Sequence, residues 1–355
     1  FTQQGNKLVG TGATGFGRQG SSVGLSSDGN TAIVGGHRDN NFTGSVWIFT
    51  RNASNWIQQG SKLTGTGSVG PSEQGFSVSL SSDGNTAIVG GASDNGLTGA
   101  AWVFTRSGGT WTQQGSKLIG TGAVGSAAQG YSVAISGDGN TAIIGGYSDN
   151  TNAGAAWIFT RSGGVWSQQG TKLVGTGAVG LAQQGSSVSI SADGNTTIIG
   201  GRSDDAGAGA AWVFTRSGNI WTQQGSKLVG TGGVPNPTLF AISVSLSADG
   251  NTAMIGRSSD NLSTGAVWVF VRNIGVWSQQ GSKIVGTGAI GSSSQGYSVS
   301  LSSDGNNALV GGWLDNTNTG AVWMFNRGST TWMKTGEKLV GTGGVGSGQQ
   351  GFSVA

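Results

Sequence analysis

Short apolar segments of strand length follow one another along the whole chain and recur in the same order. In the third copy they cover residues 111–122, 129–136, 141–146 and 154–161. Each segment is rich in β-branched or aromatic residues, and none has apolar residues at the i, i+3, i+4, i+7 spacing of a helix. We therefore predict four β-strands and no helix in each copy.

The tripeptide Asp-Gly-Asn anchors each copy and fixes the repeat length. Successive copies are 55, 55, 55, 56 and 55 residues apart, with the aspartates at Asp28, Asp83, Asp138, Asp193, Asp249 and Asp304. A period of this size built from short strands is typical of a β-propeller, in which each repeat forms one sheet. We predict an all-β fold of four-stranded antiparallel blades in a single domain, residues 1–355. The repeats are 1–55, 56–110, 111–165, 166–220, 221–276 and 277–331, with a partial repeat at 332–355.

Residue size indicates how the strands are ordered within a blade. Residues 129–136 are the innermost strand a, 141–146 are strand b, 154–161 are strand c and the segment from Trp166 is the outermost strand d. Asp-Gly-Asn joins strands a and b as a tight hairpin, because Gly and Asn tolerate positive φ. Strand c carries a large residue for packing between blades, namely Trp47, Trp102, Trp157, Trp212, Trp268 and Trp323. Six further tryptophans begin strand d, and Trp313 occupies neither of these two repeated tryptophan positions.

The number of blades depends on whether the two terminal segments pair with each other as strands of one blade. The chain opens on a d segment from Phe1 to Leu8 and stops inside a seventh a segment from Gly351 to Ala355. Propellers often close by pairing the two ends within one blade, so we predict seven blades, with six as the alternative. The bare edges of these terminal strands predict either further residues after Ala355 or self-association through both segments.

Composition narrows the class of protein. Charged residues make up only 9% of the chain, glycines number 71, and the hydrophobic 35% are spread evenly, which predicts a repetitive globular body without a transmembrane span. The absence of cysteine excludes disulfides and thiolate sites. A Cys-free chain rich in Ser, Thr, Asn and Gly favours an extracellular or cell-surface location. We expect no cofactor.

Most charged residues are locked to the repeat. Seven lysines share one d-strand position, six arginines end strand c, and a second aspartate follows strand b at Asp39, Asp94, Asp149, Asp204, Asp260 and Asp315. Charges spread evenly around a ring indicate structural or solvating roles, so we exclude nucleic acid as a partner. We interpret the second aspartate as an Asx-turn that caps the loop backbone, with a lone metal ligand as the alternative.

Gly-x-Gly-x-x-Gly recurs in most copies, for example from Gly120 to Gly125. A dinucleotide site needs this loop between a strand and a helix, and no helix is predicted after it. We interpret the glycines as the loop from strand d of one blade to strand a of the next.

The repeat resembles a known family. Gly75-Phe-Ser-Val-Ser, Asp83-Gly-Asn, Ala87-Ile-Val-Gly-Gly91 and Gly99-Ala-Ala-Trp-Val-Phe104 resemble the FG-GAP repeat of the integrin α-subunit propeller and its bacterial surface relatives. The resemblance implies a seven-bladed propeller that acts in adhesion or ligand binding, often with calcium in the a-to-b hairpin. Here each hairpin has one carboxylate, too few for Ca²⁺, so we predict no metal site.

Differences among the repeats point to candidate ligand-binding residues. The position after the Gly-Gly of strand b varies most, and the d-to-a loops vary too, on the same predicted face. The candidates are His37, Tyr147, Arg202 and Trp313 after strand b, and Phe16, Arg18 and Phe240 in the d-to-a loops.

These residues lead to a functional hypothesis. We predict a non-catalytic extracellular binding or adhesion propeller that recognises a protein or glycan through the b-to-c and d-to-a loops. The alternative is a structural repeat subunit of an extracellular or cell-surface assembly. A hydrolase is a remote alternative, because the sequence lacks paired carboxylates, and we predict no catalytic residues.

Overall fold

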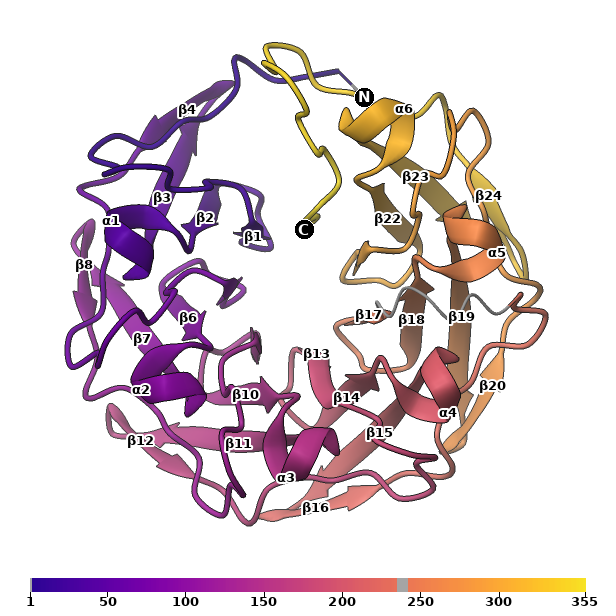
Figure 1. Ribbon diagram of the computed structural model, residues 1–355, viewed down its shortest axis with the longest axis horizontal. Coiled ribbons are helices and arrows are strands. Elements are labelled where there is room, and N and C mark those ends of the chain that lie inside the picture. The colour runs from indigo at the N-terminus through magenta and orange to yellow at the C-terminus, as the bar shows by residue number, and fades with distance from the viewer. Residues whose placement is uncertain (1, 235–241) are drawn as a thin grey trace.

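The computed structural model describes residues 2–234 and 242–355, which form a ring of radially arranged sheets (Figure 1). Over these residues the structure has six sheets, each of four antiparallel strands in chain order. The predicted β-propeller is therefore confirmed. The six-bladed alternative is the correct one, and the prediction of seven blades is wrong.

Each blade contributes one strand to each of four concentric positions. The inner strands a are β1 (Ser22–Leu25), β5 (Ser77–Leu80), β9 (Ser132–Ile135), β13 (Gln184–Ile190), β17 (Ile242–Leu246) and β21 (Ser298–Leu301). The b strands are β2 (Thr31–Gly36), β6 (Thr86–Gly91), β10 (Thr141–Gly146), β14 (Thr196–Gly201), β18 (Thr252–Arg257) and β22 (Asn307–Gly312). The c strands are β3 (Ser45–Asn52), β7 (Ala100–Ser107), β11 (Ala155–Ser162), β15 (Ala210–Ser217), β19 (Ala266–Asn273) and β23 (Ala321–Arg327). The outer d strands are β4 (Asn55–Gln58), β8 (Thr110–Gln113), β12 (Val165–Gln168), β16 (Ile220–Gln223), β20 (Val276–Gln279) and β24 (Trp332–Lys334).

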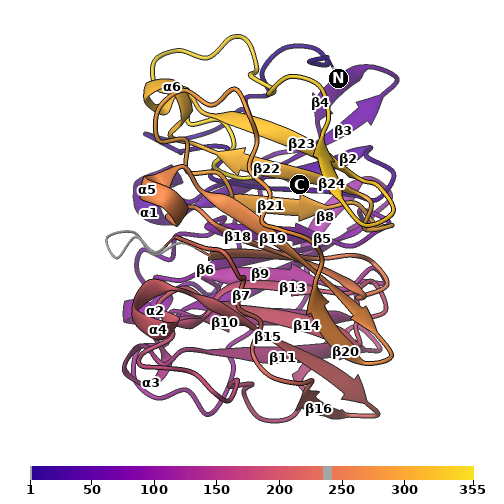
Figure 2. The same cartoon turned by 90° about the vertical axis from the view of Figure 1, so that its right-hand side faces the viewer.

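One-turn segments between strands b and c were not predicted. They are α1 (Asp39–Phe42), α2 (Asp94–Leu97), α3 (Asp149–Asn152), α4 (Asp204–Gly207), α5 (Asp260–Ser263) and α6 (Asp315–Asn318). Each contains two residues with left-handed dihedrals, such as Asn150 and Thr151 with φ of 49° and 54°, so they are compact turns and not regular helices. All of them lie on one face of the ring (Figure 2).

The predicted a-to-b hairpin forms as expected. Asp138 Oδ1 accepts hydrogen bonds from Ser136 Oγ at 2.5 Å and from the Asn140 amide at 2.9 Å, and Gly139 has a φ of 69°. Partial burial raises the pKa of Asp138, but these hydrogen bonds outweigh it, so the pKa lies below its ordinary value. The carboxylate therefore holds the turn closed.

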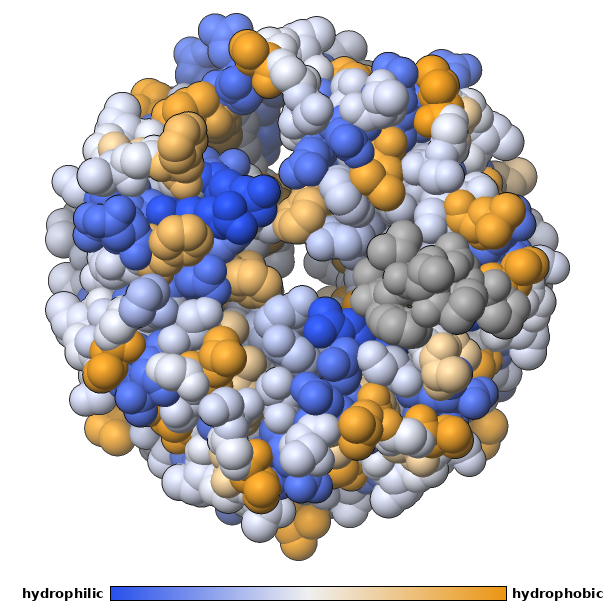
Figure 3. Space-filling model, in the orientation of Figure 1, coloured by the Kyte–Doolittle hydropathy of each residue, from blue (hydrophilic) through white to orange (hydrophobic). Residues whose placement is uncertain are grey.

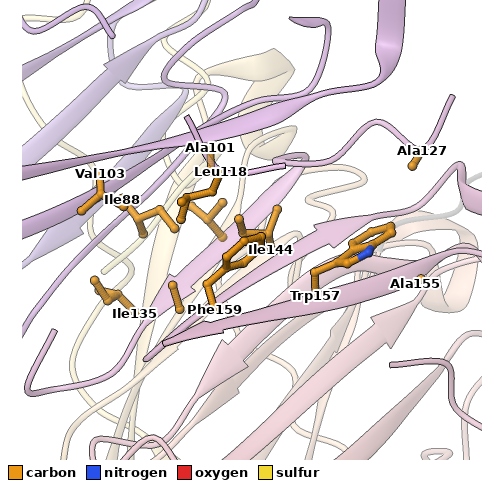
Figure 4. Close-up of a cluster of buried hydrophobic side chains, with 12 residues drawn as sticks. Ile88, Ala101, Val103, Leu118, Ala127, Ile135, Ile144, Ala155, Trp157 and Phe159 are labelled. Carbon is orange, nitrogen blue, oxygen red and sulfur yellow. The ribbon is translucent and has the colours of Figure 1, made fainter. Parts of the chain in front are cut away.

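Tryptophans of strand c fill the space between blades. Trp157 is fully buried with Leu118 and Val103 of the preceding blade in one apolar cluster (Figure 4). Its Nε1 donates to the Thr121 carbonyl at 2.8 Å, so the indole is both packed and hydrogen-bonded. Burial of one such ring stabilises the fold by about 2–3 kcal/mol. The predicted packing role of these tryptophans is confirmed.

The second repeated aspartate and the repeated lysine form a buried ion pair. Asp149 Oδ2 lies 2.5 Å from Lys172 Nζ, and its Oδ1 accepts from the Val124 amide at 2.7 Å. The interpretation as an Asx-turn is therefore wrong, because the carboxylate binds Lys172, just after strand d, and the d-to-a loop. The equivalent pairs are Asp39–Lys62, Asp94–Lys117, Asp204–Lys227, Asp260–Lys283 and Asp315–Lys338.

Backbone hydrogen bonds also link neighbouring a-to-b hairpins around the axis. The Ser27 amide donates to the Ser82 carbonyl at 3.0 Å, and the Ser82 amide donates to the Gly137 carbonyl at 2.9 Å. The same bond continues through Ala192 and Ala248 to Ser303. Adjacent blades are thus tied by backbone as well as by side chains.

The two ends of the chain meet between the first and last blades. The C-terminal segment runs through this sector toward the centre of the ring (Figure 1). The Val23 amide donates to Ser353 Oγ at 3.1 Å, and the Thr342 amide donates to Gln3 Oε1 at 2.6 Å. Neither Thr2 to Leu8 nor Gly351 to Ala355 is a strand, which is why the sector is not a seventh blade; Phe1 lies outside the described residues.

Candidate functional site

A cavity of ≈440 Å³ opens at the centre of the ring. Its lining comes from the start of the a strands, from the residues just after the b strands and from the d-to-a loops. The residues after the b strands lead directly into the turns α1–α6, so the cavity lies on the face of the ring that carries these turns. Figure 3 shows this face, with hydrophilic side chains beside the central opening. Propeller geometry thus brings together residues that are about 55 positions apart in the sequence.

His37 follows β2 and points into this cavity. It is 7% exposed, its Nδ1 lies 3.0 Å from Ser21 Oγ, and its ring packs edge-on against Phe76 at 5.4 Å between centroids. Burial lowers the pKa of His37 below its ordinary value, Glu73 raises it in part, and Arg38 and Arg18 lower it further. The imidazole is therefore neutral at neutral pH and available as a base.

Arg202 occupies the position after β14 and is held rigidly. Its Nε donates to Gln183 Oε1 at 2.6 Å, and its Nη1 donates to Tyr131 Oη at 3.0 Å. The guanidinium also stacks over Tyr147, with its Cζ 4.6 Å from the ring centroid. A planar cation fixed in this way is suited to a carboxylate, phosphate or carbonyl oxygen.

Arg18 and Glu73 occupy the same position in two successive d-to-a loops. Both have left-handed backbone, with φ of 49° and 56°. Glu73 Oε2 accepts a hydrogen bond from Ser93 Oγ at 2.6 Å, which orients the carboxylate. Among the described residues that line the cavity, three are arginines, Arg18, Arg38 and Arg202, and one is a carboxylate, Glu73. The positive charges outnumber the negative one, so the cavity favours an anionic ligand.

Aromatic rings form the rest of the cavity wall. Tyr297 lies 4.8 Å from Phe352 and 5.7 Å from Trp313, measured between ring centroids. Burial raises the pKa of Tyr297 to about 12, with a smaller contribution from Tyr131 and an opposing one from Arg202. The phenol therefore stays protonated and can donate a hydrogen bond within the site.

The structure separates the predicted ligand-binding residues into groups. His37, Arg18 and Arg202 line the cavity. Tyr147 and Trp313 are not part of the lining, but each contacts a ring that is, Tyr131 and Tyr297 respectively. Phe16 is 94% exposed and is not part of the lining, and Phe240 lies outside the described residues.

Sequence reasoning missed several lining residues. Glu73, Phe76, Tyr131, Tyr297 and Phe352 all line the cavity. The aromatic residues share one repeat position, which is Ser21 or Ser186 in other copies. The variation at this position, just before strand a, could have identified these residues as candidates. It was overlooked because the residues on either side, Gln-Gly and Ser-Val, are repeated in most copies.

Metal binding finds no support in the part of the chain that the structure describes. There, no group of three or more His, Asp or Glu side chains could hold a metal ion. In each a-to-b hairpin the carboxylate binds the turn itself: both oxygens of Asp28 accept hydrogen bonds from Ser26 or Asn30.

Comparison with solved structures finds proteins of similar fold at low sequence identity. No family model matches the chain, and no curated protein matches it. A putative 6-phosphogluconolactonase from Bacteroides uniformis is 13% identical, with a TM-score of 0.63, over 91% of this chain and 85% of that one. The periplasmic gluconolactonase PpgL of Pseudomonas aeruginosa is 15% identical, with a TM-score of 0.56, over 91% and 86%. A functionally unknown protein from Desulfotomaculum acetoxidans is 15% identical, with a TM-score of 0.56, over 90% and 88%.

These comparisons correct the functional hypothesis. Of these three neighbours, the two whose names give an activity are lactonases, which are hydrolases, and this contradicts the predictions of a non-catalytic binding or adhesion propeller and of a non-enzyme. The propeller part of the FG-GAP resemblance holds, but no family model supports FG-GAP membership. Nothing supports a protein or glycan partner. At these identities the likeness shows the fold, and the chemistry has to be argued from the site.

A membrane-spanning helix was not expected, and the described residues contain no helix long and apolar enough to cross a bilayer. The extracellular or cell-surface location stays a prediction.

Proposed function

We propose that the axial cavity is the active site of a hydrolase that opens the lactone ring of a small sugar acid carrying an anionic group. The main support for this proposal is that charged residues outside the repeat pattern line this cavity. Six of the ten arginines end strand c. Of the other four, Arg18, Arg38 and Arg202 line the cavity together with the only histidine, within the described residues. The volume, ≈440 Å³, suits a small molecule.

His37 is proposed as the general base. With Nδ1 protonated and donating to Ser21 Oγ, the other ring nitrogen has a lone pair that can take a proton from water. The lowered pKa of His37 keeps this nitrogen unprotonated at neutral pH. As the imidazolium forms, the negative charge of Glu73 stabilises it.

The reaction then follows from groups already in place. Water adds to the carbonyl carbon, and its proton passes to His37. The bond between this carbon and the ring oxygen breaks, and the ring oxygen takes the proton from the imidazolium. The product is an open-chain hydroxy acid, whose carboxyl group loses one proton to solvent.

The arginines are proposed to bind negative charge at two stages. Arg202 is held by Gln183 and Tyr131, so it can stabilise the carbonyl oxygen as it becomes an oxyanion without reorganising. Arg18 and Arg38 are exposed at the cavity and can bind the anionic group of the substrate. The printed names of the two lactonase neighbours support the choice of a sugar lactone.

Proton release measures this activity directly. We expect glucono-1,5-lactone and 6-phosphoglucono-1,5-lactone to be hydrolysed faster than their spontaneous rates in a pH-stat at pH 7, the phosphorylated lactone more efficiently. His37→Asn should lower kcat by about 10²–10⁴-fold. Arg18→Gln should raise KM for the phosphorylated lactone more than for the neutral one.

Phe16→Ala is the matched control, because Phe16 lies in the same loop as Arg18 but is 94% exposed and outside the cavity lining. Its kinetics should equal those of the wild type. Rates no higher than spontaneous hydrolysis with both lactones would refute the proposed function.

A further inference from the structure

One position of the repeat contributes a side chain to the axial cavity from copy after copy. It follows Gln-Gly in most copies, just before or at the start of strand a. In ring order, the residues at this position that line the cavity are Ser21, Phe76, Tyr131, Ser186, Ile242, Tyr297 and Phe352. Because consecutive copies are neighbours around the axis, the aromatic residues form two pairs that face each other across the cavity.

The two aromatic pairs have nearly the same geometry. The ring centroids of Phe76 and Tyr131 are 4.8 Å apart, with an interplanar angle of 41°. Those of Tyr297 and Phe352 are also 4.8 Å apart, with an interplanar angle of 44°. Burial is the main cause of the raised pKa of Tyr297, and Tyr131 raises it further, so the two pairs are close enough to interact electrostatically across the cavity.

Each pair is also supported by a third ring outside the lining. Tyr147 lies 4.5 Å from Tyr131, and Trp313 lies 5.7 Å from Tyr297, measured between ring centroids. Tyr131 is further fixed by Arg202, whose Nη1 donates to Tyr131 Oη at 3.0 Å. The two aromatic pairs are therefore held in place before any ligand binds.

Filling the centre of the ring does not account for these four aromatic residues. Each of them is only half-buried, and they line a cavity of ≈440 Å³. Ser21 and Ser186 occupy the same position in two other copies, so a blade does not need a large side chain there for its own packing. Their partly exposed rings are therefore available to a ligand.

The openings between the two aromatic pairs are polar. The first copy contributes Ser21 and His37 on one side, where Ser21 Oγ lies 3.0 Å from His37 Nδ1. The fourth copy contributes Ser186 and Arg202 on the other side. The cavity thus has two apolar walls and two polar openings.

We propose that the two aromatic pairs are the walls of a slot that selects a six-membered sugar ring with only C–H groups on both of its faces. The faces of aromatic rings carry partial negative charge and pack well against C–H groups. An axial hydroxyl turned toward either wall loses water without gaining an equal partner, whereas equatorial hydroxyls point to the polar openings. This inference rests on the proposed function, because that function places a sugar ring in the cavity, and it adds the residues that determine which sugar ring is accepted.

Three ring compounds without a lactone bond test the slot separately from the reaction. They are the 6-phosphates of 1,5-anhydroglucitol, 1,5-anhydroallitol and 1,5-anhydrogalactitol. Every ring hydroxyl of the glucitol compound is equatorial, whereas the other two each have one axial hydroxyl, on opposite faces of the ring. In titration calorimetry with the whole protein, the glucitol compound should bind saturably, and each of the other two about tenfold more weakly.

Phe76→Ser and Phe352→Ser each open one wall of the slot. Both variants should fold, because serine occupies the same position at Ser21 and Ser186, and melting curves check this. Each variant should reduce the difference in affinity for one of the two axial compounds, and the two variants should do so for different compounds. Phe16→Ser is the matched control and should leave all three affinities unchanged, because Phe16 is 94% exposed and outside the lining.

Several results would overturn the slot. They are equal binding of the three compounds, weaker binding of only one axial compound, unchanged differences in both serine variants, or no binding of any compound. The proposed hydrolysis fails in a different way: discrimination among the three compounds without hydrolysis of either lactone supports the slot and refutes the hydrolase. Hydrolysis together with equal binding of the three compounds refutes the slot alone.

Discussion

Asp149 Oδ2 lies 2.5 Å from Lys172 Nζ, and the aspartate side chain is only 1% exposed while the lysine is 19% exposed. The pair joins the b-to-c turn to the segment that follows strand d of the same blade, and the other carboxylate oxygen accepts a hydrogen bond from the Val124 amide of the d-to-a loop. One aspartate thus connects three segments near the face that contains the candidate site.

Removal of the lysine from this buried pair should destabilise the protein far more than removal of a charge from an exposed pair. Lys172→Met leaves a buried carboxylate without its cation, so we expect a loss of about 3 kcal/mol in the free energy of unfolding. Glu337→Ala is the control, because Glu337 is 95% exposed and 4.0 Å from Lys334 Nζ, and it should change stability by less than about 0.5 kcal/mol. Urea denaturation followed by tryptophan fluorescence measures both. Similar losses for the two variants would contradict a structural role for the buried pair.

Two equivalent glycines should respond differently to the same substitution. Gly120→Ala forces a methyl group against Trp157, and we expect it to destabilise the protein by about 3 kcal/mol or prevent folding. Gly341→Ala should be much milder, because the nearest atoms to its added methyl group are the side-chain oxygens of Gln350 at 3.3 Å and Gln3 at 3.4 Å, which can shift. Melting temperatures of the two variants, measured side by side, check this. A neutral Gly120→Ala would contradict the packing of Trp157.

His37 can be titrated without ambiguity, because it is the only histidine. Its ring NMR signal should titrate below its ordinary pKa of about 6.5, since burial and the nearby arginines disfavour the imidazolium. Glu73→Gln should lower this pKa further, and Arg38→Gln should raise it. Lactone hydrolysis should fall as the pH drops through the same value. A midpoint above that of a free histidine would contradict the burial and charge pattern of the site.

The a-to-b hairpins should make stability depend on acid pH. Hydrogen bonds from Ser26 and Asn30 lower the pKa of Asp28 to about 2, so its contribution is fully present above the unfolded pKa of about 3.9 and is lost as the pH falls toward 2. The pKa of Asp304 is lowered in the same direction. The melting temperature should therefore drop between about pH 4 and pH 2. Asp28→Asn should reduce that drop, and an unchanged pH profile would contradict the assignment.

The repeat made much of the fold predictable. Asp-Gly-Asn located every a-to-b hairpin, and the spacing of Trp157 and its equivalents located strand c and the packing between blades. The blade count was mispredicted because it depends on whether the terminal segments pair as strands, and local sequence patterns do not determine that pairing. The ion pair of Asp149 and Lys172 was missed because its partners are 23 residues apart and on different segments.

The candidate site was only partly predictable for a related reason. His37 and Arg202 stood out because they interrupt a monotonous position, and both line the cavity. Glu73 and Tyr297 come from other repeat positions, and only the ring geometry places them beside those two residues. Phe16 stood out equally in the sequence, yet it points to solvent, because variation marks exposure as well as function.

The hydrogen-bonded series of a-to-b hairpins begins at Ser27 and stops at Ser303, on the two sides of the sector where the ends of the chain meet. Within the described residues, hydrogen bonds to side chains bridge this sector in place of the backbone series, such as those from the Val23 amide to Ser353 Oγ and from the Thr342 amide to Gln3 Oε1. The sector is therefore the weakest junction of the ring, and the cooperativity of the molecule should partly resemble that of a solenoid. Fraying should begin in β1–β4 and β21–β24, each with only one complete neighbouring blade, and should reach β9–β12 and β13–β16 last. The backbone amides of the molecule should accordingly exchange with solvent in a graded order set by their distance around the ring from this junction.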